Sequence, residues 1–438
     1  MTPVATLTAG QLLLFLLQVS LLLTLALCLG RLAARLGLPA VVGELLVGVL
    51  LGPSLLGHTF PQVSAWLLPR DPAQFHLLDA FAQVGVLLLV GLTGMQMDLG
   101  LVRRRKAAAA YVSLAGLIIP LGLGVAIGFL LPASLRGPAA QPVVFALFLG
   151  VAMCVSAIPV IAKTLIDMNL LHRNIGQLTL TAGIIDDIFG WLMLSVVSAM
   201  ATQGARAGHA VLSLLYLVIT VAIAVLLGRR LAGGPLGWAA RSGEPGAGLA
   251  AVVAIILLTA TATHAMGLEP VFGAFVAGMV LRASGKVPPS AESVLRVIVL
   301  WVLAPIFFAT AGLRMDLTAL ADPRVLGAAL IVLAVAIAGK FIGAYVGARA
   351  SRLTHWEALA LGAGMNGRGV IEVIVAMVGL RIGVLNTAAY TIIILVAVVT
   401  SLMAPPLLRW AFAHIERSAE EGLREMEARA RMSAQPRA

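Results

Sequence analysis

The stretch IGQLTLTAGIIDDIFGWLMLSVVSAM, residues 175–200, is mostly apolar and holds two adjacent carboxylates, Asp186 and Asp187, near its middle. It is long enough to cross the hydrocarbon of a bilayer as a helix, which takes ~20 residues. Ionised side chains are costly at that depth and mark functional sites. Each carboxylate must hold a proton, pair with a cationic side chain or bind a metal ion. The pair therefore predicts an intramembrane site that handles ions.

The composition places this stretch in a membrane protein. Of the 438 residues, 61% are hydrophobic and only 11% charged, and the mean hydropathy is +1.04. Too little polar surface is available to cover a soluble globule. The net charge of +11 comes from basic residues in short loops, so we expect no binding of nucleic acid. Cys28 and Cys154 lie in apolar segments, which indicates no disulfide framework. No signature of a soluble enzyme is found, and residues 11–29 read as a retained helix because a basic segment and a cleavage site are missing.

Hydropathy predicts an all-α polytopic protein with about thirteen spans. The expected spans are 10–29, 39–57, 77–97, 107–131, 143–167, 175–201, 211–232, 247–266, 269–283, 293–313, 324–350, 356–380 and 386–410. Residues 1–413 then form one transmembrane domain. Residues 414–438 form a short charged tail, which is either a solvated or membrane-surface helix or a disordered end.

The distribution of Lys and Arg fixes the expected orientation. Fifteen of them fall in loops on one side, with six more at and after the last span, and six fall on the other side. This asymmetry predicts a cytoplasmic C-terminus in the inner, plasma membrane.

A weak internal repeat links the two halves of the chain. The segment Pro39-Ala-Val-Val-Gly43 with Gly48 is followed later by Pro270-Val-Phe-Gly273 with Gly278. Likewise, Gly94-Met-Gln-Met-Asp-Leu99 is echoed by Gly312-Leu-Arg-Met-Asp-Leu317. Both pairs are offset by seven spans. An odd offset makes the halves cross the membrane in opposite senses, which predicts an inverted repeat.

The same offset pairs the fifth span with the twelfth, and both contain helix breakers. The fifth has Cys154-Val-Ser-Ala-Ile-Pro159, and Pro159 lacks a backbone donor. The twelfth has Gly362-Ala-Gly-Met-Asn-Gly-Arg-Gly369, where glycines weaken a helix around Asn366 and Gly367. Crossed, broken helices near the midplane expose backbone groups that can bind an ion. We expect the site there, beside the aspartates, in preference to simple kinks.

Other charged residues also fall inside spans. Lys340 is far from either end of its span, so we expect it to pair with an aspartate of the sixth span. Arg368 and Glu372 are spaced i, i+4 and form a supporting ion pair. Glu44 either lines the pathway or ties helices together. His264 and Glu269 lie near a span end at the outer face, where we expect ordinary solvation.

The chain resembles a known family through several motifs taken together. These are LPAVVGELLVGVLLGPS at residues 38–54, Asp186-Asp187, Pro305-Ile-Phe-Phe308 with Gly312, Lys340, and Gly367-Arg-Gly369. They are similar to those of monovalent cation:proton antiporters of the bacterial sodium/proton exchanger type, the second large cation:proton antiporter group. The resemblance implies a thirteen-helix homodimer. It also implies a dimerisation panel of spans 1–3 and 8–10, and a core of spans 4–6 and 11–13 that moves in an elevator-like manner.

By the same resemblance, Asp187 matches the ion-binding carboxylate, and Asp186 the acid that pairs with the lysine, here Lys340. Two aspartates and a lysine are typical of electrogenic members. Ser156 matches a polar site residue, but Ala157 stands where relatives have Ser or Asp, so one ligand is missing. The expected activity is exchange of Na⁺ or K⁺ for protons, with no cofactor beyond the transported ions. The alternative is a proton-coupled antiporter or cation symporter of a small organic substrate; a non-transporting receptor or channel is a third class.

Overall fold

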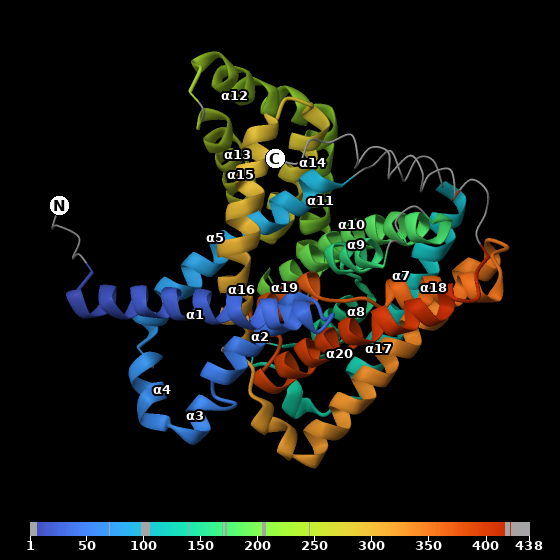
Figure 1. Ribbon diagram of the computed structural model, residues 1–438, viewed down its shortest axis with the longest axis horizontal. Coiled ribbons are helices and arrows are strands. Elements are labelled where there is room, and N and C mark those ends of the chain that lie inside the picture. Colours follow the sequence, from blue (N-terminus) through green and yellow to red (C-terminus); the bar gives the residue numbers. More distant parts are fainter. Residues whose placement is uncertain are drawn as a thin grey trace.

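The computed structural model describes residues 7–69, 71–97, 106–138, 140–168, 170, 173–203, 207–244, 246–416 and 421. Within these residues the chain is helical and forms no strand, apart from one isolated bridge between Arg136 and Leu385 (Figure 1). The predicted all-α fold class is therefore confirmed. Several residues used for the orientation, Arg70, Arg103, Arg104, Arg105 and Arg206, lie outside the described residues, as do Asp98, Leu99 and most of the predicted tail.

Among the described residues up to Ser242, the chain forms eleven labelled α-helices. They are α1 (Ala9–Arg35), α2 (Ala40–Leu51), α3 (Leu56–Thr59), α4 (Pro61–Leu67), α5 (Pro72–Gln96), α7 (Lys106–Leu130), α8 (Pro142–Cys154), α9 (Ile158–Asp167), α10 (Asn174–Gln203), α11 (Ala207–Leu226) and α12 (Gly228–Ser242). A short 3-10 turn, Ala133–Leu135, precedes α8.

The second half begins at α13. Its helices are α13 (Ala247–Ala265), α14 (Pro270–Ser284), α15 (Pro289–Ile298), α16 (Ala304–Gly312), α17 (Pro323–Ala350), α18 (His355–Met365), α19 (Val370–Arg381) and α20 (Thr387–Phe412). A π-helical turn, Val299–Leu303, joins α15 to α16, and a 3-10 turn, Leu317–Ala321, precedes α17.

The helices support a polytopic membrane protein. Among the described residues, nine helices are long and apolar enough to cross a bilayer, or eleven if each of two bent pairs is one span. The helices α8 and α14 are shorter. The number thirteen stays a prediction. One element was not expected: after α11 the chain bends by 56° at Leu227 and continues as α12, where a loop was predicted.

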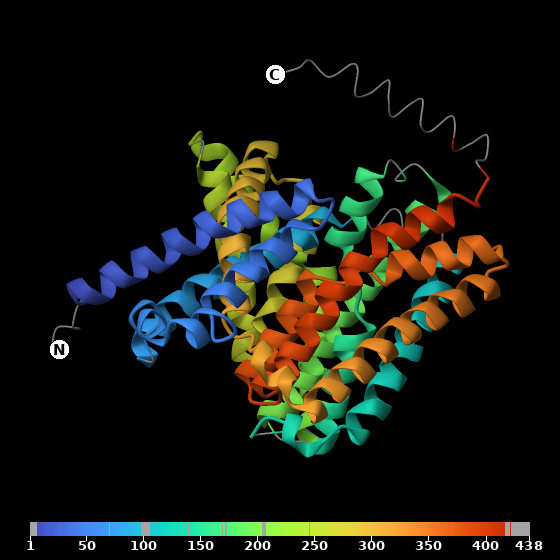
Figure 2. The ribbon, with the colours of Figure 1, turned by 60° about the horizontal axis from the view of Figure 1, so that its bottom comes forward.

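Two groups of helices can be distinguished by their packing partners. The panel group, α1, α2, α5 and α13 to α16, packs mainly on itself. The core group, α7 to α10 and α17 to α20, also packs mainly on itself. In Figure 1 the helices α13, α14 and α15 run together, and in Figure 2 the core helices α7, α17, α18 and α20 lie side by side. This grouping follows the predicted division, whose functional roles remain predictions.

Glycines mark the closest approaches within the panel group. A Cβ atom at Gly48 in α2 would overlap the backbone of α16 at Ala309 and Gly312. A Cβ at Gly278 in α14 would overlap the backbone of α5 at Gly91. In the predicted repeat, α2 corresponds to α14 and α16 corresponds to α5. The contact between α2 and α16 therefore corresponds to the contact between α14 and α5. The repeat itself stays a prediction, which this matching pair of contacts supports.

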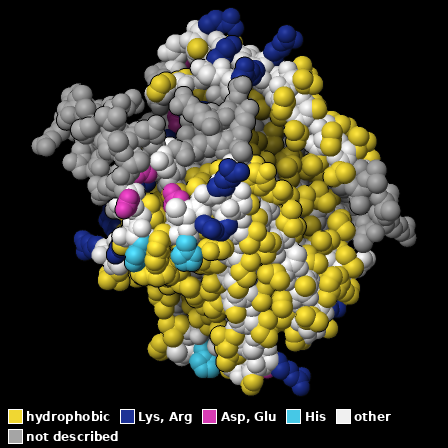
Figure 3. Space-filling model, turned by 90° about the vertical axis from the view of Figure 1, so that its right-hand side faces the viewer, with side chains coloured by type: hydrophobic (Ala, Val, Ile, Leu, Met, Phe, Trp, Pro, Cys, Tyr) yellow, Lys and Arg dark blue, Asp and Glu magenta, His cyan; other side chains and the backbone are white. Residues whose placement is uncertain are grey.

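The outer surface is suited to a bilayer. Large apolar side chains are exposed along several helices, among them Leu13 on α1, Ile118 on α7 and Leu258 on α13. Figure 3 shows hydrophobic side chains covering a broad area of one face, with few charged side chains within it. Apolar exposure on this scale is expected where lipid, and not water, surrounds the helices.

The start of the tail contacts the core group. Arg173, just before α10, forms an ion pair of 3.0 Å with Glu421, and both residues are buried. Glu421 also accepts a hydrogen bond of 2.6 Å from the backbone N–H of Asn174. A carboxylate at a helix N-terminus is favoured by the helix dipole. Glu421 therefore contacts the start of α10, and the predicted alternatives for the tail, a solvated or membrane-surface helix or a disordered end, stay predictions.

Candidate functional site

Helix α10 carries both aspartates into the interior. Asp186 and Asp187 are each 0% exposed. Neighbouring residues of an α-helix point ~100° apart because there are 3.6 residues per turn. The two carboxylates therefore meet different surroundings.

Asp186 forms the predicted ion pair with Lys340. The distance from Lys340 Nζ to Asp186 Oδ2 is 2.7 Å, and both side chains are fully buried. The ammonium also donates to the carbonyl oxygens of Gly116, at 3.0 Å, and of Cys154. All three ammonium donors thus have acceptors. A buried charge is tolerated when it is paired and fully hydrogen-bonded in this way.

The fifth predicted span is broken between α8 and α9. Residues 155–157 are not helical, and Pro159 is the second residue of α9, where its missing N–H costs no helical hydrogen bond. The break thus lies before the proline. The Ser156 hydroxyl lies 3.0 Å from Asp186 Oδ2 and 2.8 Å from the carbonyl oxygen of Met365. Ser156 therefore reaches Asp186.

The twelfth predicted span is broken between α18 and α19, with a bend of 45°. The two breaks cross each other. The backbone N–H of Ala157 donates to the carbonyl oxygen of Gly367 at 3.1 Å, close to the contact between Ser156 and Met365. Asn366, between Met365 and Gly367, is the C-cap residue that follows α18 and is fully buried.

The charges around the breaks complement the helix ends. Arg368 donates to the carbonyl oxygens of Ala152, at 2.9 Å, and Met153, in the last turn of α8. Together with Lys340 it places two positive charges at the negative end of α8. Neither oxygen of the Asp187 carboxylate accepts a hydrogen bond.

The predicted ion pair between Arg368 and Glu372 is long. The closest distance is 3.9 Å, whereas Glu372 accepts a hydrogen bond of 2.8 Å from the backbone N–H of Gly369. Arg368 mainly binds carbonyl oxygens, including that of Ala336 in α17 at 3.2 Å. The break in α8 offers unpaired carbonyls, and these compete successfully with the carboxylate for the guanidinium.

Asp187 and Asn366 have side-chain polar atoms without hydrogen-bond partners. Each has two such atoms, and all four are buried. Among the described residues, no other side chain with two polar atoms has both of them buried and unpartnered. Leaving buried polar groups unpaired costs about 1–3 kcal/mol each, and more when they are charged. Both groups are therefore open to a proton, a water molecule or a cation.

Glu44 does not join this site. It is half-buried in α2, and its side chain lies against Gly30 of α1. The salt bridges between described residues do not include Glu44, and its predicted role, lining the pathway or tying helices together, stays a prediction. Helix α2 belongs to the panel group, which separates Glu44 from the breaks in the core group.

Glu269 also differs from expectation. It is 5% exposed and is bound by Arg381 at 2.7 Å and by the Ser198 hydroxyl at 2.6 Å. The expected solvation applies to His264, which is exposed. Glu269 and Arg381 carry opposite charges, and both are expected at the outer side of the membrane. This shared location is the sequence signal that could have revealed the pair.

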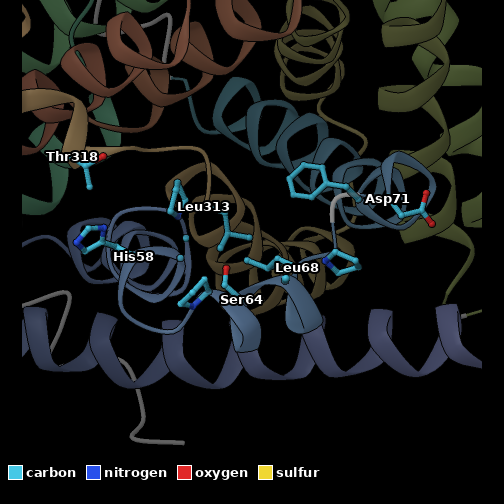
Figure 4. Close-up of a pocket in the computed structure, with 13 residues that line it drawn as sticks. His58, Ser64, Leu68, Asp71, Leu313 and Thr318 are labelled. Atoms are coloured by element: carbon cyan, nitrogen blue, oxygen red, sulfur yellow. The ribbon is translucent and has the colours of Figure 1, made fainter.

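A cavity of about 490 Å³ lies away from the aspartates. Figure 4 shows its labelled residues, which come from α3, α4 and the segments around α5 and α16. They include His58, Ser64, Asp71, Leu313 and Thr318. The cavity contains none of the predicted site residues.

Comparisons with known proteins place the chain in a family. Residues 21–414 match the family model described as sodium/hydrogen exchanger, transmembrane. The chain is 33% identical over 401 residues to the Na⁺/H⁺ antiporter NhaS4 of Synechocystis sp., covering 91% of this chain and 97% of that protein. It is 28% identical to the K⁺/H⁺ antiporter 1 of Saccharomyces cerevisiae, covering 85% of this chain and 43% of that protein.

The fold is also that of a solved structure. The sodium proton antiporter MjNhaP1 of Methanocaldococcus jannaschii matches with a TM-score of 0.66 and 17% identity, over 92% of this chain and 99% of that chain. At this identity the match bears on the fold alone. The chain spans about half the length of several relatives that it matches, among them plant cation/H⁺ antiporters of Arabidopsis thaliana.

Proposed function

This chain belongs to the sodium/hydrogen exchanger family, and on that premise we propose that it exchanges Na⁺ or K⁺ for protons across a membrane. The observation that carries the proposal is the Asp187 carboxylate, which is fully buried beside the crossed breaks with both oxygens unpartnered. Such a group needs a positive partner, and either a proton or a metal cation supplies one.

Competition for Asp187 couples the two fluxes. Protons neutralise the carboxylate on one side of the membrane, and the cation displaces them on the other. The empty, charged site is costly to move through a dry region, so the site crosses only when it is occupied. Exchange is therefore obligatory, and the apparent KM for the cation rises as the pH falls.

Oxygen ligands for the cation come from few side chains. Ala157 offers none, and the Ser156 hydroxyl is shared between Asp186 and Met365. The Asn366 amide is unpartnered, and its oxygen is of the type that binds hard cations. We assign Asn366 as a neutral ligand that complements Asp187, with backbone carbonyls of the breaks completing the shell.

Asp186 and Lys340 form the second titratable element. Their ion pair lies one residue from Asp187 along α10, and Ser156 links it to the twelfth-span break. Two aspartates with a lysine are typical of electrogenic members of the family that the chain resembles. We therefore propose that more than one proton moves for each monovalent cation, so that exchange is electrogenic. We propose that the core group moves against the panel group, in a homodimer held by the panel.

The test is proton movement in proteoliposomes. Purified protein is reconstituted with a pH-sensitive dye, and Na⁺, K⁺ or Li⁺ is added with and without an imposed membrane potential. We expect a salt gradient alone to move protons, at a rate that the potential changes. Proton movement that requires an organic substrate would support the alternative transporter class, and a lack of any coupled movement would contradict both.

A further inference from the structure

Glu269 joins the two helix groups through its side chain and its backbone. Ser198 of α10 donates to Glu269 Oε1 at 2.6 Å, and Arg381 at the end of α19 donates to Oε2 at 2.7 Å. The backbone N–H of Glu269 donates to the hydroxyl of Ser195 at 3.1 Å. Both carboxylate oxygens and the backbone amide are therefore held by residues of the core group.

The position of Glu269 makes these contacts unusual. It is the residue before α14, in the panel group, where a carboxylate commonly caps its own helix. The side chain makes no such cap and turns to α10 and α19. Among the ion pairs between described residues, this one alone joins the groups: Asp79 with Arg314 lies within the panel, and the pairs of Asp186 and Glu372 within the core.

The cluster lies on the helix that carries the ion site. Ser195 and Ser198 follow Asp187 by about two and three turns, or ~12 and ~17 Å along α10. They are at the end opposite Arg173 and the docked tail. The predicted orientation places that end at the outer side of the membrane. These contacts therefore hold the core group against the panel group at a level between Asp187 and the outer side of the membrane.

We propose that Glu269 is a positioning residue that latches the core group to the panel group at the outer end of α10, and that this latch opens and re-forms in each exchange cycle. The inference rests on the proposed exchange by relative motion of the groups. A displacement of α10 by one helical turn, ~5.4 Å, exceeds what hydrogen bonds of 2.6 and 2.7 Å tolerate. The latch thus favours the state with its outer side closed and slows departure from it.

Reversible crosslinking tests whether the contact separates. Ser198→Cys and Glu269→Cys are combined with Cys28→Ser, since Cys28 is exposed, and treated with a short bis-methanethiosulfonate reagent. We expect exchange to fall more than tenfold and to recover after reduction. The matched control is Asp79→Cys with Arg314→Cys, a pair held at 2.6 Å within the panel, which keeps its exchange when crosslinked.

Charge variants test the latch without crosslinking. We expect Glu269→Gln and Arg381→Gln each to raise turnover threefold to tenfold with little change in the apparent KM for the cation. The reversed pair, Glu269→Arg with Arg381→Glu, restores the original turnover, and Asp79→Asn leaves turnover unchanged.

The outcomes separate the latch from the proposed function. If the crosslinked protein exchanges as fast as the reduced one, or if both single charge variants match the wild type, the latch is wrong while exchange stands. If the wild type itself moves no protons, the proposed function fails. If the double-cysteine protein is inactive before crosslinking, the turnover of the single charge variants and of the reversed pair decides whether the latch exists.

Discussion

The panel group and the core group share their glycine packing and differ in where their helices are broken. Glycines let helix backbones touch in both groups, as Gly278 does against Gly91 in the panel and Gly343 against Ala115 in the core. In the core, two predicted spans are also interrupted, between α8 and α9 and between α18 and α19. Among the described residues, every charged side chain that is at most 1% exposed belongs to the core: Asp186, Asp187, Lys340, Arg368 and Glu372.

This difference shows what the breaks contribute. A continuous helix uses its own carbonyls for its backbone hydrogen bonds, and here carbonyls of two such helices, those of Gly116 in α7 and Ala336 in α17, accept from the buried cations. The interrupted end of α8 offers those of Ala152, Met153 and Cys154, which Arg368 and Lys340 bind. Fully buried charge is therefore sustained in the core, whereas Glu269, the buried carboxylate of the panel, is paired with residues of the core. Each of the following substitutions tests one side of that contrast.

The largest effect is expected at Lys340. Lys340→Met leaves Asp186 buried without its cation and frees the carbonyls of Gly116 and Cys154. Breaking one partner of a buried ion pair typically costs about 3–5 kcal/mol. Thermal unfolding in detergent should show a large loss of stability, and Asp186→Asn with Lys340→Met should recover much of it without recovering exchange. If Lys340→Met alone were as stable as the wild type, the ion pair between Lys340 and Asp186 would not stabilise the fold.

The next largest effect is expected at the panel contacts. In Gly278→Ala a Cβ would overlap the backbone of Gly91, and overpacking of this kind costs about 1–3 kcal/mol. Gly122→Ala in α7 is the matched control, because nothing lies within 4 Å of its Cβ position. Thermal unfolding should separate the two variants. Equal stability of both would show that the panel is not packed through its glycines.

Asn366→Leu should alter ion binding more than folding. Its amide has no partner to lose, so the removal costs little stability. The apparent KM for the cation should rise about tenfold, which corresponds to about 1.4 kcal/mol. Thr310→Val is the control. It removes an unpartnered buried hydroxyl from the panel helix α16 and should leave the KM for the cation unchanged. A similar KM in both variants would exclude Asn366 as a ligand.

The smallest effect is expected at Glu44. This residue lies against α1 in the panel, apart from the crossed breaks. Glu44→Gln should change the exchange rate less than twofold in the proteoliposome assay. A loss comparable to that of a core variant would place a second pathway through the panel.

The sequence predicted the core better than the panel contacts. Costly groups within apolar runs identified Asp186, Asp187 and Lys340, because few stable solutions exist for a buried charge. The two breaks followed from Pro159 and the glycines around Asn366. The i, i+4 spacing predicted the long ion pair of Arg368 with Glu372, but it did not reveal the closer carbonyl partners in α8, which lie 215 and 216 residues away.

Tertiary contacts between loops and tails were also missed. Glu269 reads as a solvated residue until Ser198 and Arg381 are brought to it by the fold. The docking of Glu421 on Arg173 joins residues from the tail and the start of α10, and neither has a local pattern that reveals the other. Hydropathy places helices in a membrane, but it does not report which helix ends meet.

The central claim is that the exchanged ions share the Asp187 carboxylate. Asp187→Asn keeps the shape of the side chain and removes the charge for which proton and cation compete. In proteoliposomes, cation-dependent proton movement should fall to the level of protein-free vesicles, while Glu44→Gln reconstituted in parallel retains it. Exchange at the wild-type rate in the Asp187→Asn protein would contradict the account.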